Sequence, residues 1–180
     1  MKKIAILILG LITYQFSFTQ ISSAEKQKVE SLLKQMTVNE KIGQMTQVTM
    51  AVVATNGWGN QDGNLDPAAL KKAIIDYGVG SILNDVSNAL TAEKWRANIT
   101  QIEDEAKNTR LKIPVIYGLD GIHGQTYTLN STLFPQSIAM AATRNPDLVR
   151  QAAKVTAMEL RASGVRWNFA PVLDCGRQPL

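Results

Sequence analysis

The chain has 180 residues, of which 45% are hydrophobic and 19% charged, an ordinary globular composition that excludes a disordered protein. Its net charge of +4 includes two lysines of an expected leader, and no basic run follows, so nucleic acid is not an expected partner. The single cysteine, Cys175, excludes an internal disulfide, and no cysteine–histidine spacing predicts a metal site. We interpret Cys175 as a small buried side chain, with a reactive thiol as the alternative.

The first residues have the form of a secretory signal. Lys2 and Lys3 precede an apolar run that reaches to about Phe18. This run is shorter than the ~20 residues that a membrane-spanning helix needs, so no stable membrane anchor is expected. Small and polar residues then predict cleavage somewhere in 18–24. Residues 1–24 are therefore predicted to be a signal peptide that directs export to the periplasm or the exterior, with a retained anchor as the alternative.

Apolar spacing and helix-capping residues divide the remaining chain into alternating elements. Thr37 and Glu40 form a capping-box pattern, and Asp66-Pro67 and Asn145-Pro146 each place a cap before a proline. In chain order we expect helices over 25–36 and 38–44, a strand within 45–53, an exposed loop over 55–64, a helix over 67–77, a strand over 79–83, a helix over 91–107, a strand over 115–119, a polar loop over 126–134, a short apolar segment over 135–142, a helix over 146–163 and a strand over 165–170.

This alternation predicts an α/β fold in which right-handed crossovers build a parallel sheet. The sequence has room for about four strands. An eight-stranded barrel typically needs ~250 residues, so the chain would hold about half of one. A small doubly wound sheet suits the length as well, and the residue pattern does not decide between the two.

The segment Ile113–Gly124 is the first candidate for a functional site. A short β-branched run is followed by three glycines, an acid, Asp120, and the only histidine of the chain, His123. Ligands of α/β proteins usually bind on loops at the carboxyl ends of parallel strands, where this acid is expected. The local pattern alone also allows plainer roles. Asp120 would then cap a turn, and His123 would hold backbone in place.

Six segments stand out, in order along the chain: Lys41–Met45, Tyr77–Ile82, Tyr117–Gly124, Phe134–Gln136, Ala142–Val149 and Trp167–Asp174. In sequence and spacing they resemble family 3 glycoside hydrolases, above all the secreted bacterial β-glucosidases of that family. The resemblance covers nearly everything after the leader. It implies that residues 25–180 form the first half of a (β/α)₈ TIM-like barrel, the incomplete N-terminal domain of such an enzyme.

The resemblance also implies a role for individual residues. Asp120 matches the family aspartate that accepts hydrogen bonds from hydroxyls of the terminal glucose, and Arg177 matches the arginine that contacts the same sugar. An ionised carboxylate accepts from two hydroxyls together, whereas a guanidinium only donates, so the pair is complementary. His123 is a possible supporting residue. In the family, the nucleophile and the acid/base come later in the sequence, so both are expected beyond Leu180, and no catalytic residue is assigned within this chain.

The implied parent protein is a retaining, exo-acting β-glucosidase that hydrolyses a small β-glucoside or oligosaccharide and needs no cofactor. We expect the 180-residue chain alone to be inactive. β-Xylosidase or another exo-glycosidase specificity is an alternative, and so is a non-catalytic sugar-binding or interaction module. Trp58 could stack on a sugar ring, Trp95 and Trp167 are predicted to lie in the core, and Asp174 is expected to be a structural hydrogen-bonding residue. The sequence predicts no oligomeric state.

Overall fold

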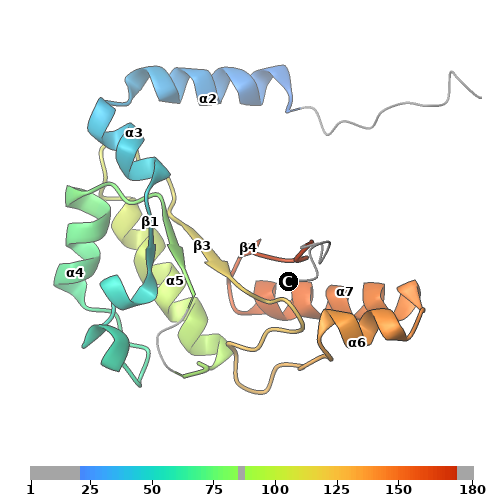
Figure 1. Ribbon diagram of the computed structural model, residues 1–180. Coiled ribbons are helices and arrows are strands. Elements are labelled where there is room, and N and C mark those ends of the chain that lie inside the picture. The colour runs from blue at the N-terminus through green and yellow to red at the C-terminus, as the bar shows by residue number, and fades with distance from the viewer. Residues whose placement is uncertain (1–20, 85–87, 174–180) are drawn as a thin grey trace, which may run out of the picture. The chain divides into compact units, whose positions relative to one another are not determined.

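The computed structural model describes residues 21–84 and 88–173 (Figure 1). The predictions for most of the leader, and for Asp174, Cys175 and Arg177, therefore lie outside the described residues. The chain divides into two compact units at the junction between Gln35 and Met36. In the part that the structure describes, no helix is long and apolar enough to cross a membrane.

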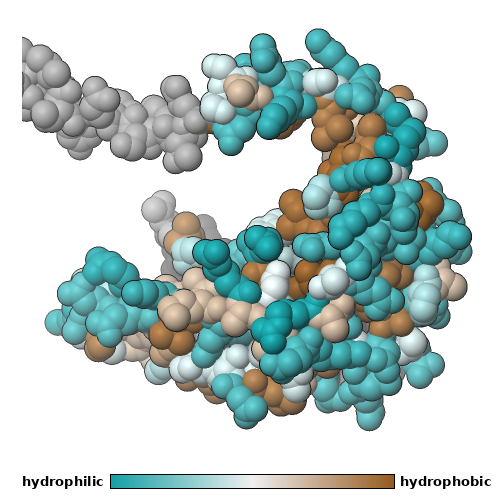
Figure 2. Space-filling model, turned by 180° about the vertical axis from the view of Figure 1, so that it is seen from behind, coloured by the Kyte–Doolittle hydropathy of each residue, from teal (hydrophilic) through white to brown (hydrophobic). Residues whose placement is uncertain are grey.

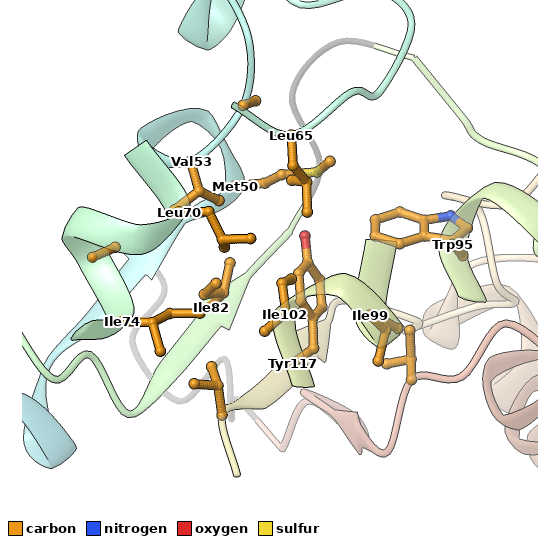
Figure 3. Close-up of a cluster of buried hydrophobic side chains, with 14 of the residues drawn as sticks. Met50, Val53, Leu65, Leu70, Ile74, Ile82, Trp95, Ile99, Ile102 and Tyr117 are labelled. Carbon is orange, nitrogen blue, oxygen red and sulfur yellow. The ribbon is translucent and has the colours of Figure 1, made fainter. Parts of the chain in front are cut away.

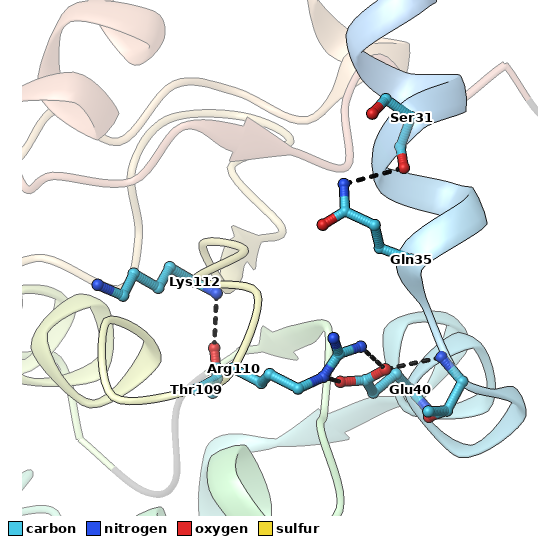
Figure 4. Close-up of polar contacts among 7 residues, drawn as sticks. Ser31, Gln35, Glu40, Thr109, Arg110 and Lys112 are labelled. Carbon is cyan, nitrogen blue, oxygen red and sulfur yellow. Dashed lines mark hydrogen bonds and ion pairs between the residues drawn. The ribbon is translucent and has the colours of Figure 1, made fainter.

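The described part of the first unit consists of one helix, α2 (Ser23–Gln35), where a helix was expected over 25–36. The helix begins with reciprocal bonds between Ser22 and Glu25, and near its end the side-chain amide of Gln35 donates to the carbonyl of Ser31 (Figure 4). No residue of α2 is buried. The predicted helix is thus confirmed.

The second unit is built on a parallel sheet of four strands in the order β1-β2-β3-β4. The central pairs bring Val48 opposite Ile82, Ile82 opposite Tyr117, and Leu119 opposite Asn168. Because all strands run in one direction, their carboxyl ends meet at one edge, which confirms the predicted α/β alternation. The strands are β1 (Gln47–Thr49), β2 (Ser81–Leu83), β3 (Ile116–Leu119) and β4 (Trp167–Asn168).

Helices connect the strands, and their predicted caps are confirmed. Thr37 and Glu40 form both bonds of a capping box, Asp66 accepts from two backbone amides, and Asn145 accepts from two more. The helical elements are α3 (Val38–Met45), η1 (Met50–Val52), η2 (Gly57–Gly59), α4 (Pro67–Lys71), η3 (Lys72–Asp76), α5 (Ala92–Ala106), α6 (Ser137–Ala142) and α7 (Pro146–Ala162).

The core lies where α4, η3 and α5 pack against the sheet (Figure 3). Trp95 is fully buried, as predicted, and its ring meets Tyr117 of β3 edge to face at 5.5 Å between centroids. Burying one large apolar side chain contributes about 1.5–3 kcal/mol, so this cluster is the main source of stability. Its largest fully buried members are Trp95, Met50, Leu70, Ile74, Ile82, Ile102 and Leu119.

Two sequence predictions are wrong in detail. Trp167 is 39% exposed, because β4 is an edge strand among the described strands and the indole packs only on one side, against Phe169 at 4.7 Å between centroids. The loop over 55–64 is not simply exposed. Asn60 is buried within it, donates to the carbonyls of Thr55 and Asn64 at 2.9 Å, and accepts from the amide of Gly63.

Large apolar side chains also reach the surface of the second unit. Figure 2 shows apolar side chains among hydrophilic ones over the face that it presents. Ile138 of α6 is 83% exposed, and no residue of this helix is buried. Leu148 and Val149 of α7, the helix that contacts α6, are 51% and 37% exposed. The surface near α6 is therefore more apolar than scattered single residues would make it.

Helix α3 is fixed against the rest of the second unit by a bidentate ion pair (Figure 4). Arg110, which precedes β3, donates from Nε and Nη2 to the two carboxylate oxygens of Glu40 at 2.9 and 2.6 Å. The backbone amide of Thr37 donates to the same carboxylate at 2.7 Å. These contacts, that of Arg110 foremost, lower the pKa of Glu40 from its ordinary 4.5 to about 2.

This pKa predicts a pH-dependent stability. A carboxyl group with a lowered folded-state pKa stabilises the fold above its unfolded-state pKa, and the contribution is lost as the pH falls toward the folded-state value. Wild type should therefore unfold at higher urea concentration than Glu40→Gln at pH 7, with a difference that shrinks between about pH 5 and pH 2. Asp76→Asn, the same type of change at an exposed carboxyl group, serves as the control. A difference between wild type and Glu40→Gln that stayed constant across this range would contradict the assignment.

Candidate functional site

Asp120 directly follows β3 and so lies at the carboxyl edge of the sheet. The residue is partly buried, and its backbone carbonyl accepts from the amide of Ile122 at 2.9 Å. Among the described residues, none donates a hydrogen bond to the Asp120 carboxylate. A carboxylate to which no described residue donates retains its capacity to accept from a ligand.

Asn168, the last residue of β4, holds the backbone next to this acid. Its Oδ1 accepts from the amide of Gly121 at 2.9 Å, and its Nδ2 donates to the carbonyl of Gly121 at 3.1 Å. The amide of Phe169 donates to Leu119 at 3.0 Å, so the ladder between the two strands continues into side-chain bonds. The sequence patterns predicted no role for Asn168. The available signal was an amide residue at the end of a predicted strand.

His123 joins the same loop to the segment after it. Its Nδ1 lies 2.9 Å from the carbonyl of Phe134, which can only accept, so Nδ1 carries the proton. Its Nε2 lies 2.9 Å from the amide nitrogen of Gln136 and accepts from it. The amide of Phe134 donates back to the carbonyl of His123 at 2.8 Å. Both ring nitrogens thus contact protein groups, and the ring holds the loop after β3 to the segment at Phe134 and Gln136.

The rest of the loop is fastened to α5 and α7. The indole Nε1 of Trp95 donates to the carbonyl of Tyr127 at 2.9 Å, and the amide and hydroxyl of Thr132 donate to the Glu159 carboxylate at 3.0 and 2.8 Å. Gly124 has φ +115°, and a Cβ there would lie 2.1 Å from the carbonyl oxygen of Thr132. Only glycine fits at this crossing. The loop therefore has one fixed path.

A cavity of about 660 Å³ opens beside this loop. His123, Gly121 and Asn168 contribute to its wall, and the rest of the lining is mostly apolar and comes from α6, α7 and the segment after β4. Asp120 is not among the lining residues. The cavity is thus adjacent to the acid rather than around it.

The structure places Asp120 and His123 on one loop, directly after β3. Arg177 lies outside the described residues, so its approach to Asp120 stays a prediction. Asn84 follows β2 as Asp120 follows β3, and its side-chain oxygen is buried without a hydrogen-bond partner among the described residues. The described residues contain no cluster of three acidic, histidine or cysteine side chains that could hold a metal ion.

Residues 37–180 match the family described as Glycosyl hydrolase family 3 N terminal domain. The lysosomal beta glucosidase of Dictyostelium discoideum is 35% identical over 167 residues, with 88% of this chain and 20% of that protein covered. The periplasmic beta-glucosidase of Salmonella typhimurium is 35% identical over 153 residues, with 84% and 17% covered. A beta-xylosidase of Formosa agariphila is 35% identical over 104 residues, with 56% and 14% covered. The chain spans about a fifth or less of these relatives.

Solved structures of similar proteins agree with this assignment. An exo-1,3/1,4-beta-glucanase from a Pseudoalteromonas species has a TM-score of 0.69 at 27% identity, over 84% of this chain and 18% of that one. A beta-glucosidase of Listeria innocua, solved with isofagomine, has a TM-score of 0.61 at 30% identity, over 86% and 19%. The domain is of the TIM-barrel type, which decides against a doubly wound sheet. The chain belongs to glycoside hydrolase family 3, within whose N-terminal domain residues 37–180 fall.

Proposed function

We propose that this chain supplies part of the glucose-binding subsite of a retaining, exo-acting β-glucosidase. The observation that carries the proposal is Asp120, a partly buried residue at the carboxyl edge of the sheet whose carboxylate accepts no hydrogen bond from the described residues. Two of the relatives, those from Dictyostelium discoideum and Salmonella typhimurium, are named as beta-glucosidases, which supports the choice of sugar.

In this proposal, Asp120 accepts hydrogen bonds from two neighbouring hydroxyls of a terminal glucose. Such bonds are charge-assisted and stronger than those between neutral groups. Arg177 donates to the same sugar. His123 supports the loop that carries Asp120 through its bonds to Phe134 and Gln136. Because the sugar is held by acceptor and donor together, both its position and its orientation are fixed.

The bond-breaking groups of the proposed enzyme lie beyond Leu180. Retaining glycosidases use two carboxyl groups ~5–5.5 Å apart, one as nucleophile and one as acid/base. Our proposal assigns neither role to a residue of this chain. The exposed apolar surface near α6 supports the view that further polypeptide covers this part of the barrel.

The proposal predicts that the isolated 180-residue chain does not hydrolyse p-nitrophenyl β-D-glucoside, whereas the full-length gene product does. The release of p-nitrophenol measures the activity of each of the two proteins. Turnover by the isolated chain would contradict the absence of catalytic groups, and a full-length protein that is inactive on every β-glycoside would contradict the enzyme itself. If the isolated chain instead melts cooperatively and binds glucose while no reading frame continues past Leu180, the module alternative is correct.

A β-xylosidase is the second candidate, favoured by the relative of that name from Formosa agariphila. The two specificities differ by the hydroxymethyl group of glucose, which xylose lacks. Comparing kcat/KM of the full-length protein on p-nitrophenyl β-D-glucoside and β-D-xyloside decides between them. Export is proposed from the leader pattern and from the periplasmic location in the name of the Salmonella relative.

A further inference from the structure

The direction of the Asp120 carboxylate depends on its backbone. No described residue donates to this carboxylate, so no described side chain fixes it directly. The next residue, Gly121, is held in place because its backbone N–H and C=O are both hydrogen-bonded to the side chain of Asn168. The direction of the Asp120 side chain therefore depends on the backbone position of Gly121.

Gly121 is enclosed from two sides. A Cβ at this position would lie 3.1 Å from Oδ1 of Asn168 and 3.1 Å from Cδ1 of Leu160 in α7, with Thr156 at 3.4 Å. The peptide thus fits between the end of β4 and the face of α7. Because Asn168 and Gly121 are 47 positions apart, this contact joins the two neighbouring strand ends that the proposed subsite needs together.

We propose that Asn168 is a positioning residue for the sugar-binding acid: its amide clamps Gly121 and thereby fixes the direction of the Asp120 carboxylate. The proposal rests on the proposed function, in which Asp120 binds a terminal sugar. The amide suits this role because it offers one acceptor and one donor at the spacing of the backbone N–H and C=O of a single residue. Asn168 itself does not touch the substrate.

The test is a double-mutant cycle in the full-length protein, with Asn168→Ala, Asp120→Ala and the combined variant. Asn168→Ala should lower kcat/KM on p-nitrophenyl β-D-glucoside by roughly 10- to 100-fold, because a small misplacement of a binding group costs rate on that scale. If Asn168 acts through Asp120, adding Asn168→Ala to Asp120→Ala should cost less than about threefold more. Fully additive losses would overturn the proposal.

Asn98→Ala is the matched control. Asn98 is a buried asparagine in α5 whose side chain also donates to a backbone carbonyl, that of Gly63 at 2.8 Å, and that carbonyl lies outside the loop over 120–134. The Asn98→Ala variant should have a lower melting temperature than wild type, but a much smaller loss of kcat/KM than Asn168→Ala. Equal kinetic losses in Asn98→Ala and Asn168→Ala would mean that Asn168 is merely structural.

Hydrogen exchange separates this proposal from the proposed function. The Gly121 amide should exchange at least about tenfold faster in Asn168→Ala than in wild type, because it loses its acceptor. Mass spectrometry of the peptide over 117–124 measures this whether or not the protein hydrolyses a glucoside. An inactive wild type would refute the proposed function, whereas unchanged exchange at Gly121 would overturn the positioning role.

Discussion

In the proposed β-glucosidase, replacing Asp120 by Asn in the full-length protein is expected to lower kcat/KM for a β-glucoside by roughly 10²- to 10³-fold. Hydrogen bonds to a charged group contribute about 1.5–3 kcal/mol each, and every 1.4 kcal/mol is a factor of about ten. The fold should be unaffected, because no described residue donates to this carboxylate. The melting temperature of the variant should therefore match that of wild type, while its kcat/KM, measured by steady-state kinetics, is strongly reduced.

The control for this prediction is Asp76→Asn, which makes the same chemical change at an exposed position of η3. It should leave both kcat/KM and the melting temperature unchanged. If Asp120→Asn kept full activity, the acid would be a turn residue and the sugar would bind elsewhere. If it instead lost stability without a kinetic effect specific to the glucoside, its role would be structural.

Replacing Trp95 by Ala is expected to destabilise the chain by about 3–5 kcal/mol, the usual cost of removing a buried tryptophan. Trp95 is fully buried, meets Tyr117 edge to face, and donates from Nε1 to the carbonyl of Tyr127. Since small domains have only about 5–15 kcal/mol of stability, this loss is a large fraction. Urea unfolding followed by circular dichroism measures it.

Trp58→Ala provides the matched comparison, because Trp58 is 63% exposed in the short helix η2. Its free energy of unfolding should change by less than about 1 kcal/mol. Trp95→Phe should lie between the two variants, since it keeps much of the apolar volume but loses the bond to Tyr127. A Trp95→Ala variant as stable as Trp58→Ala would contradict the assignment of the core.

Local features of the sequence were sufficient to predict most of the fold. Helix starts could be located because Thr37, Asp66 and Asn145 accept from amides within their own first turn. The buried position of Trp95 followed from helical periodicity along α5. Strand β3 could be placed because β-branched residues precede a glycine-rich segment. Each of these signals acts within a few residues.

The parts that the sequence did not predict depend on distant contacts. Asn168 holds Gly121 across 47 positions, and Arg110 pairs with Glu40 across 70. In neither pair do the neighbouring residues of one partner in the sequence indicate the other partner. Trp167 was expected in the core because the alternation of a strand does not tell an edge strand from a central one. The barrel itself was chosen over a doubly wound sheet only through family resemblance, since both begin with the same alternating units.

The most direct test of the sugar-binding assignment is a crystal structure of the full-length protein with isofagomine, the ligand present in the Listeria innocua structure. We predict that the oxygens of Asp120 lie about 2.5–3.0 Å from two neighbouring hydroxyls of the ligand, with the guanidinium of Arg177 on the same ring. A ligand bound at another edge of the sheet, with Asp120 and Arg177 directed away from it, would contradict the account.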